Sequence, residues 1–385
     1  MSVWDEVVGQ APTVDLLRSA VASARGDGAG MTHAWLLTGP PGSGRSIAAR
    51  AFAAALECDE PEAGCGRCQA CRTVIAGSHA DVTTVHTEGN EILVADTRSL
   101  VSLAQRRPSI GRWRVILVED ADRLNEKSGN ALLKALEEPT PRTVWLLCAP
   151  SAQDVLITIR SRSRHLALRT PPPDAVARLL VERDGVDPTM AAYAARAAQS
   201  HIGLARRLAT DEQARNRRRA VVRMPLELRS VGEAVLHAAE LLAVATEEAE
   251  AGTAARDGTE RADLLRALGA DTGARTLPPH VRSQVAELEK NQKRRAKRFV
   301  ADMLDRSLLD LMSVYRDVLV LHAGLGDELV NAEMRPDIAR LASLLPPEHA
   351  LRRMDVIRET RARLGTNASP LLAVEAMTVG LRLPT

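Results

Sequence analysis

Aromatic residues, long apolar runs and an excess of one charge are all missing from this sequence. Trp, Tyr and Phe make up only 2% of the 385 residues, which argues against a surface that stacks nucleic-acid bases on aromatic rings. The 51 basic residues nearly balance the 49 acidic ones, for a net charge of +2. Any contact with nucleic acid must therefore come from local clusters of charge and not from a global positive field.

Targeting and membrane signals are also lacking. The N-terminus MSVWDEVVGQ has no basic segment followed by an apolar stretch, and no run of about 18 apolar residues occurs anywhere. We therefore expect neither a signal peptide nor a membrane span, and we take the cytoplasm as the default location.

The chain does have enough apolar sequence, 45% of its residues, to build real cores, and its length is typical of two to three domains. Up to residue 169, short apolar runs alternate with helical patterns, as in a parallel sheet covered by helices. The expected strands are 34–38, 81–85, 114–118 and 144–148. The expected helices are 46–57, 97–107 and 126–138, the last with Asn125 as its N-cap.

Three consecutive prolines at 171–173 form a stiff spacer and put the first domain boundary at 169–174. Residues 174–212 have short helical patterns only, which predicts a small helical domain. Residues 213–385 are rich in Ala, Leu, Arg and Glu with helical periodicity, which predicts an all-helical domain. Within it, the polar, glycine-containing stretch 247–278 suggests a loose insertion.

A glycine-rich loop, TGPPGSGRS, lies between the first expected strand and the next helix. The spacing Gly39-x4-Gly44 in that context predicts a phosphate-binding loop, in which backbone N–H groups surround an anion. A simple Gly/Pro turn is the alternative. The candidate nucleotide-binding residues of the loop are Gly39, Pro40, Pro41, Gly42, Ser43, Gly44, Arg45 and Ser46.

Position 45 departs from the usual motif, where a lysine reaches the β- and γ-phosphates. Arg45 keeps the charge but has a bulkier planar fork, so we expect binding to survive better than hydrolysis. Ser46 still offers a hydroxyl for Mg²⁺. ATP with Mg²⁺ is therefore a candidate ligand.

An acidic pair, Glu119-Asp120, follows the strand expected at 114–118. Acids at this place form the Walker B motif, in which one carboxylate holds the metal and the other positions water. The usual order is Asp then Glu. With the order reversed, the first side chain is one methylene longer and the second one methylene shorter, and both carboxylates are displaced at positions where exact placement controls catalysis. Ordinary solvated acids at a strand end are the alternative.

Four of the five cysteines lie in one short segment, at Cys58, Cys65, Cys68 and Cys71. In a reducing cytoplasm, four thiolates at this spacing favour a closed tetrahedral zinc site. Such a site has no open position for catalysis, so we expect structural zinc that staples the loop after the helix 46–57. Four unliganded core cysteines are the alternative, although the polar neighbours argue against it.

Together these motifs resemble the AAA+ clamp-loader subunits of bacterial DNA polymerase III, most closely the delta-prime subunits. The resemblance covers residues 1–210. It rests on WDEVVGQ (4–10), GPPGSGRS (39–46), the cysteine cluster, HADVTTVHTEG (79–89), GRWRVILVEDADRLN (111–125), NALLKALEEPTPRTVWLL (130–147) and TIRSRS (158–163).

The resemblance implies three parts: an AAA+ P-loop domain over 1–169 with a zinc-binding module at 58–71, a helical lid over 174–212, and a helical collar for oligomerisation over 213–385. It also implies that Val8 lies in the adenine-pocket segment. The collar matches only through its helical character and through RRAKRFVADMLDRSLLDLMSVYRDVL within 294–319.

The motor subunits of the family that this chain resembles carry Lys in the phosphate-binding loop, Asp-Glu in Walker B and a polar sensor after the fourth strand. This sequence has different residues at all three of these catalytic positions. Here these positions are Arg45, a degenerate Walker B pair and Ala149-Pro150. The combination suits a delta-prime-like stator, which helps the AAA+ ring load the sliding clamp on primed DNA during replication, with its own ATPase activity weak or absent. A competent ATPase motor subunit of a gamma/tau-like clamp loader is the alternative.

Arg162 in TIRSRS resembles the family's arginine finger, which acts in trans in the neighbouring subunit's site. Ser161 and Arg162 match the family's Ser-Arg-Cys, whereas Ser163 replaces the Cys. The alternative is a solvated basic edge, with Arg160, Arg162 and Arg164 on one strand face.

The implied partners are gamma/tau-like motor subunits, delta-like subunits and, through the complex, the sliding clamp and primer-template DNA. The implied location is the cytoplasmic replisome at the nucleoid, with no membrane partner. Two basic clusters, 215–219 and 290–298, could contact phosphates. Solvated helix faces are the favoured explanation for both, because nothing in the sequence orients them toward DNA.

Overall fold

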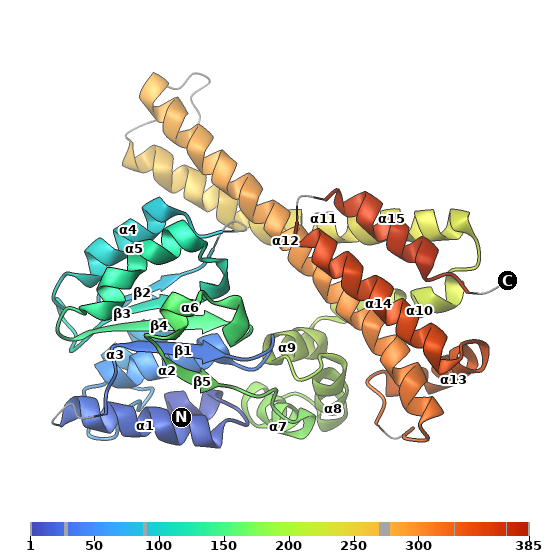
Figure 1. Ribbon diagram of the computed structural model, residues 1–385, viewed down its shortest axis with the longest axis horizontal. Helices are drawn as coiled ribbons and strands as arrows, with labels where there is room; N and C mark the ends of the chain where they lie inside the picture. Colours follow the sequence, from blue (N-terminus) through green and yellow to red (C-terminus); the bar gives the residue numbers. More distant parts are fainter. Residues whose placement is uncertain are drawn as a thin grey trace. The chain divides into compact units, whose positions relative to one another are not determined.

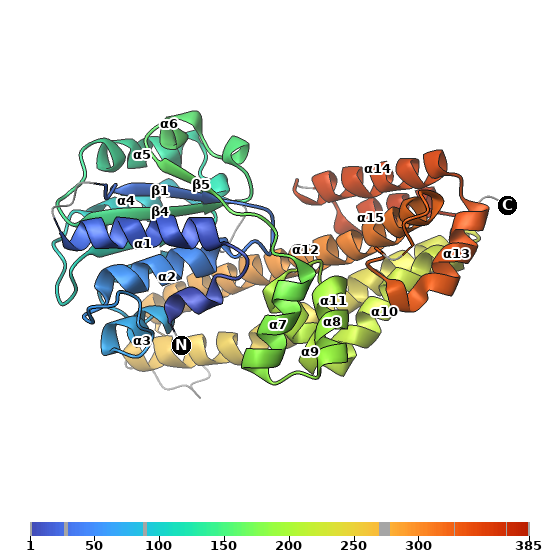
Figure 2. The same cartoon turned by 90° about the horizontal axis from the view of Figure 1, so that it is seen from below.

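The computed structural model describes residues 2–26, 30–87, 91–268, 278–326, 328–366 and 368–383. The chain divides into two compact units, Met1–Thr210 and Asp211–Thr385 (Figures 1 and 2). The second unit begins close to the expected boundary at 212–213. The expected division near 169–174 falls inside the first unit and stays a prediction.

A parallel five-stranded sheet forms the centre of the first unit. Its order is β2-β3-β4-β1-β5. The strands are β1 (Ala34–Thr38), β2 (Val82–Val85), β3 (Arg114–Val118), β4 (Thr143–Ala149) and β5 (Arg164–Ala167). The four expected strands are confirmed, and β5 is an addition that pairs with β1. β5 reads RHLA and buries only Leu166, so it lacks the apolar run that marks a buried strand.

Helices cover both faces of the sheet (Figure 1). They are η1 (Val3–Glu6), α1 (Ala11–Arg25), α2 (Arg45–Glu57), α3 (Gln69–Ile75), α4 (Val94–Ala104), η2 (Ala121–Arg123), α5 (Glu126–Glu137), η3 (Ala152–Asp154) and α6 (Ile157–Arg160). The three expected helices are confirmed as α2, α4 and α5, although α4 begins and ends three residues earlier than the expected 97–107. Asn125 caps α5 as expected, because its side-chain oxygen accepts a hydrogen bond from the Ser128 N–H at 3.0 Å.

Successive side chains along each strand point to opposite faces of the sheet, so the apolar core is divided into two parts, one on each face. Trp35 and Leu37 of β1 pack on the side of α1, α2 and α3. Leu36 packs on the opposite side, with residues of α4, α5 and α6. Since successive strand residues point to opposite faces, a fully apolar strand serves both cores at once. This explains why the central strands are continuous apolar runs.

Three short helices complete the first unit after the proline spacer: α7 (Pro173–Asp184), α8 (Pro188–Ala197) and α9 (Ile202–Thr210). Gly185 ends α7 in the left-handed conformation, and the Asp187 side chain caps α8. They form the helical segment expected at 174–212, and we call these three helices the α7–α9 segment.

The second unit is helical throughout its described residues: α10 (Glu212–Glu227), α11 (Val231–Ala267), α12 (Pro279–His322), η4 (Ala332–Met334), α13 (Arg335–Leu344), α14 (Pro347–Leu364) and α15 (Pro370–Gly380). Its core gathers Leu304, Leu308, Leu311 and Tyr315 of α12 with residues of the surrounding helices. None of the described helices is long and apolar enough to cross a membrane.

The expected loose insertion at 247–278 is wrong for most of its length. Residues 247–267 continue α11, whereas 269–277 lie outside the described residues. α12 packs along α11, and this pairing buries Leu265 together with Val281 and Val285. The polar composition therefore belongs to a two-helix arm with a narrow apolar seam, in which few positions need to be apolar.

Candidate functional site

The glycine-rich loop connects β1 to α2 at the carboxyl end of the sheet. Gly42 and Gly44 have φ values of +87° and +86°, a left-handed conformation that favours glycine. The Gly39 N–H lies 3.3 Å from the Ala149 carbonyl and 3.2 Å from that of Pro150. Parallel pairing of β1 with β4 places Thr38 beside Ala149, so the sensor position does border the loop, with Ala and Pro side chains that cannot donate hydrogen bonds.

Arg45 folds back onto the loop that it follows. Its guanidinium donates a hydrogen bond to the Gly39 carbonyl. Ser46 is half-buried in the first turn of α2. The charge that would reach a phosphate is therefore engaged by the loop's own backbone. The buried Ser43 hydroxyl has no hydrogen-bond partner within the described part of the chain. It could therefore donate a hydrogen bond to an anion bound in the loop.

Two residues that sequence reasoning missed hold this loop from outside. The buried Gln10 side chain donates to the Ser43 carbonyl at 3.3 Å and also exchanges hydrogen bonds with the Arg169 backbone. His201, between α8 and α9, lies so close to Gly42 that a Cβ there would be 2.8 Å from the His201 Cα. The α7–α9 segment thus rests directly on the loop. Gln10 is the last residue of the WDEVVGQ motif, and membership of this motif is the sequence signal that could have identified it.

Val8 is half-buried between η1 and α1. The next residue, Gly9, has φ +70°, and a Cβ there would lie 3.0 Å from the Pro171 Cβ. The segment expected to hold adenine is therefore packed against the proline spacer. The role of Val8 itself stays a prediction.

The acidic pair follows β3, as expected, but its carboxylates are engaged within the chain. Glu119 lies 2.8 Å from the Arg50 guanidinium and 3.0 Å from His86 Nδ1. Asp120 accepts a hydrogen bond from the Thr87 N–H at 3.1 Å. Neither Arg50 nor His86 was predicted to have a role. Arg50 belongs to no quoted motif, and although His86 lies within HADVTTVHTEG (79–89), the contact of both residues with Glu119 is purely tertiary.

The ionisation of this cluster follows from the geometry. Burial would raise the pKa of Glu119, but the hydrogen bonds from His86 and Arg50 outweigh it and hold that pKa below its usual range. The hydrogen bond between His86 and Glu119 in turn raises the pKa of His86. The Arg50 guanidinium and the hydrogen bond from His86 therefore stabilise the Glu119 carboxylate, which a metal ion would otherwise stabilise.

Arg162 lies in the turn between α6 and β5 and is exposed. Its guanidinium contacts Glu137 of α5, with Nε 2.7 Å from Glu137 Oε1, and the Thr158 carbonyl at 2.9 Å. The alternative of a shared strand face is wrong, because Arg160 ends α6 and only Arg164 lies in β5. Arg164 instead stacks over the Trp35 ring, 5.0 Å from its centroid.

The four clustered cysteines meet at the end of α2 and the start of α3. Their sulfur atoms all lie within 4.8 Å of one another. Tetrahedral zinc with about 2.3 Å Zn–S bonds needs sulfurs about 3.8 Å apart, so small side-chain rotations suffice. Backbone N–H groups of Arg67 and Cys68 point at the Cys65 sulfur, at 3.4 and 3.3 Å, as they do around metal-bound thiolates. The cluster could hold a metal ion.

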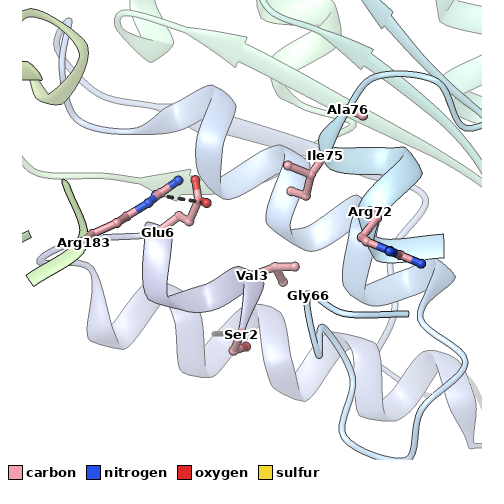
Figure 3. A pocket seen from close by; sticks show the side chains of 8 residues that line it. All are labelled: Ser2, Val3, Glu6, Gly66, Arg72, Ile75, Ala76 and Arg183. Atoms are coloured by element: carbon pink, nitrogen blue, oxygen red, sulfur yellow. Dashed lines mark ion pairs between the residues drawn. The ribbon is translucent and has the colours of Figure 1, made fainter. Parts of the chain in front are cut away.

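The cysteine loop, residues 58–71, is also tied to the N-terminus. Trp4 Nε1 donates to the Ala63 carbonyl at 3.0 Å, and the Val3 N–H donates to that of Gly64 at 2.9 Å. Beside these contacts lies a shallow pocket of about 330 Å³ (Figure 3). Glu6 and Arg183 form a 3.0 Å ion pair at its edge. η1 therefore links the cysteine loop to α7.

The basic cluster 215–219 is largely used inside the second unit. Arg218 is buried, 3.3 Å from Asp310 and 3.4 Å from Glu333. Arg217 pairs with Glu248 at 3.1 Å. A solvated helix face is therefore the wrong description of Arg218, which belongs to a buried polar network.

Comparison with known proteins finds relatives that match within the first unit. A family model described as "DNA polymerase III, delta subunit" matches residues 9–172. Over 166 residues the chain is 39% identical to the DNA polymerase III subunit delta' of Pseudomonas aeruginosa, covering 42% of this chain and 50% of that protein. It is 34% identical over 187 residues to the subunit gamma/tau of Mycobacterium tuberculosis, covering 47% of this chain and 32% of that protein.

The chain thus spans half or less of the length of these relatives. A solved DNA polymerase III gamma subunit-related protein of Thermotoga maritima aligns with 91% of this chain and 100% of its own at 17% identity and a TM-score of 0.39. The ordered motifs, the parallel sheet that positions them and the matched segment agree, and residues 9–172 are similar to the delta, delta' and gamma/tau subunits of DNA polymerase III.

Proposed function

We propose that this chain is a delta-prime-like stator of a clamp loader, which helps load the sliding clamp on primed DNA without turning over nucleotide itself. Its partners would be gamma/tau-like motor subunits and delta-like subunits in the cytoplasmic replisome. The observation that carries the proposal is the double engagement of Glu119 by Arg50 and His86.

The engaged groups explain why turnover would be weak. A hydrolytic site keeps one carboxylate for Mg²⁺ and another for the attacking water. Here Glu119 is compensated by two side chains, and Arg45 is bound to the Gly39 carbonyl. Recruiting either group would first require breaking these contacts, and no polar sensor follows β4. Backbone N–H groups and the Ser43 hydroxyl could still hold a nucleotide statically.

Arg162 would act in the site of a neighbouring subunit. It is exposed, and its Glu137 partner lies at the surface, so the pair can open at small cost. An arginine delivered in trans stabilises the charge of phosphoryl transfer and is worth about 10³–10⁵ in rate where fingers have been measured. A subunit that is inert itself can therefore accelerate hydrolysis next door.

The cysteine cluster would hold structural zinc. Four thiolates form a closed site, and binding would couple to local folding. Metal analysis of protein purified without chelator should find about one zinc per chain. Cys65→Ser should lose it, whereas Cys148→Ser, which changes a buried cysteine of β4, should retain it. Protein without zinc would refute this part of the proposal.

The decisive experiment reconstitutes the complex with its own motor and delta-like subunits. The isolated chain should hydrolyse ATP poorly or not at all. In the complex, Arg162→Ala should strongly lower DNA-stimulated ATP hydrolysis and clamp loading, whereas Arg98→Ala, an exposed arginine of α4, should leave both unchanged.

Two outcomes would contradict the stator assignment. Motor-like turnover by the isolated chain, abolished by Arg45→Ala, would favour the alternative of a competent gamma/tau-like ATPase. Clamp loading at the unmodified rate by a complex that carries Arg162→Ala would exclude the finger.

A further inference from the structure

The second basic cluster, residues 290–298 of α12, contains six basic residues. The first acidic residue after it is Asp302. As sequence, it looks much like the cluster at 215–219. The structure separates the two, because Arg218 of the first cluster is buried in a polar network. In the second cluster most charges lie outside the helix packing.

α11 and α12 lie side by side in both views (Figures 1 and 2). Val281 and Val285 of α12 are buried against α11. Further along the same face, Gln292 donates to the Asp257 carbonyl at 3.0 Å, and Arg295 pairs with Asp257 and Glu260. This face of α12 is therefore occupied by α11.

The opposite face carries the remaining cations. At about 100° per residue, positions 290, 293, 294 and 297 fall within an arc of about 100°, centred roughly opposite the seam that contains 281, 285, 292 and 295. We call these four residues, Lys290, Lys293, Arg294 and Lys297, the basic stripe. Lys290, Lys293 and Lys297 are exposed, and Arg294 is half-buried.

Nearby acids do little to neutralise the basic stripe. Glu289 pairs with Arg261 at 3.1 Å, and Asp302 pairs with Arg298 at 3.6 Å. Glu287 lies 3.7 Å from Lys290, a surface contact of small energy. The acids of α11 that face this region, Asp257 and Glu260, are taken by Arg295.

We propose that the basic stripe binds the phosphate backbone of duplex DNA. The four cations form a row about 10 Å long on a rigid helix, and a duplex has one phosphate per about 3.4 Å on each strand. Such a row can therefore contact several phosphates with no need for aromatic residues or base readout. The inference goes beyond the proposed stator role, because it requires no nucleotide site and no arginine finger.

The first test measures binding of the full chain to a fluorescein-labelled duplex of about 30 base pairs by anisotropy, over a series of salt concentrations. The stripe variant carries Lys290→Gln, Lys293→Gln, Arg294→Gln and Lys297→Gln, which keep good helix formers on an exposed face. It should bind about tenfold or more weakly at about 50 mM salt. The slope of log affinity against log salt should become shallower by about 0.9 for each phosphate that the variant leaves un-neutralised.

The matched control removes the same charge from other exposed arginines of the second unit: Arg219→Gln, Arg223→Gln, Arg340→Gln and Arg352→Gln. It should bind nearly as the unmodified chain does. Equal weakening in both variants would mean that net charge alone drives binding and would overturn the proposal. A stripe variant with unchanged affinity and slope would overturn it as well.

Lysine footprinting offers an independent readout. The chain has five lysines, and three of them belong to the basic stripe. Duplex DNA should protect these three from an amine-acylating reagent, whereas the exposed Lys127 and Lys134 of α5 should stay reactive. Protection of all five lysines, or of none, would contradict the proposal. The proposal would also be contradicted if the basic stripe were needed for binding poly-glutamate while the chain did not bind duplex DNA, because this result would indicate an acidic protein partner. None of these outcomes depends on ATP hydrolysis.

Discussion

Replacing Gly42 by alanine should destabilise the first unit more than the same change at Gly44. Both glycines have left-handed φ values, +87° and +86°, so alanine costs about 1–2 kcal/mol at either position. At Gly42 the new Cβ would also lie 2.8 Å from the His201 Cα and 2.9 Å from its Cβ. Overpacking of this kind costs about 1–3 kcal/mol.

Gly44→Ala is a matched control, since no atom outside the immediate neighbours lies within 4 Å of its Cβ position. We expect a loss of about 2–5 kcal/mol for Gly42→Ala and about 1–2 kcal/mol for Gly44→Ala. Gly44 is also the N-cap of α2, where alanine is disfavoured. The difference between the two variants is therefore a lower bound on the clash with His201.

The assay is urea denaturation of the full chain followed by tryptophan fluorescence. All four tryptophans, Trp4, Trp35, Trp113 and Trp145, belong to the first unit, so the signal reports on that unit alone. His201→Ala should not rescue Gly42→Ala, because it keeps both contacting atoms. Equal losses of stability in the two glycine variants would refute the packing of the α7–α9 segment on the loop.

Three further predictions concern charges and metal in the first unit. Burial would raise the pKa of Asp81, but the N–H groups of Gly111, Ile110 and Ser109 hold it at about 2. Its stabilising effect should be complete above its ordinary pKa of 3.8 and be lost as pH falls toward 2. Asp81→Asn should lower the free energy of unfolding at pH 7 by about 3–5 kcal/mol, because Arg114 would lose its buried carboxylate partner and keep only its hydrogen bonds to the Ala80 and Arg107 carbonyls, and it should flatten the acid limb in urea titrations. Glu119→Gln should lower the pKa of His86 in an NMR titration, and an unchanged pKa would exclude their hydrogen bond. Removal of the proposed zinc by chelation should change Trp4 fluorescence, because Trp4 donates to Ala63 in the cysteine loop; an unchanged spectrum after proven metal loss would contradict that coupling.

The sequence alone determined the features that local patterns encode. Four strands were visible because each is a short apolar run between turn signals, and the start of α5 was visible through Asn125. The glycine spacing and the cysteine spacing predicted a loop and a cluster, since both depend on residues close together in the chain. Family resemblance added Arg162, which no local pattern would have singled out from its arginine neighbours.

Only the tertiary structure decided what those residues contact. β5 escaped prediction because RHLA is polar and is a strand only through its pairing with β1. The partners of Glu119 come from α2 and from the segment after β2, far apart in sequence. The two basic clusters look alike as sequence, yet one arginine is buried and three lysines are exposed. Periodicity records which residues share a face, whereas the choice of what covers that face is made when distant segments pack together.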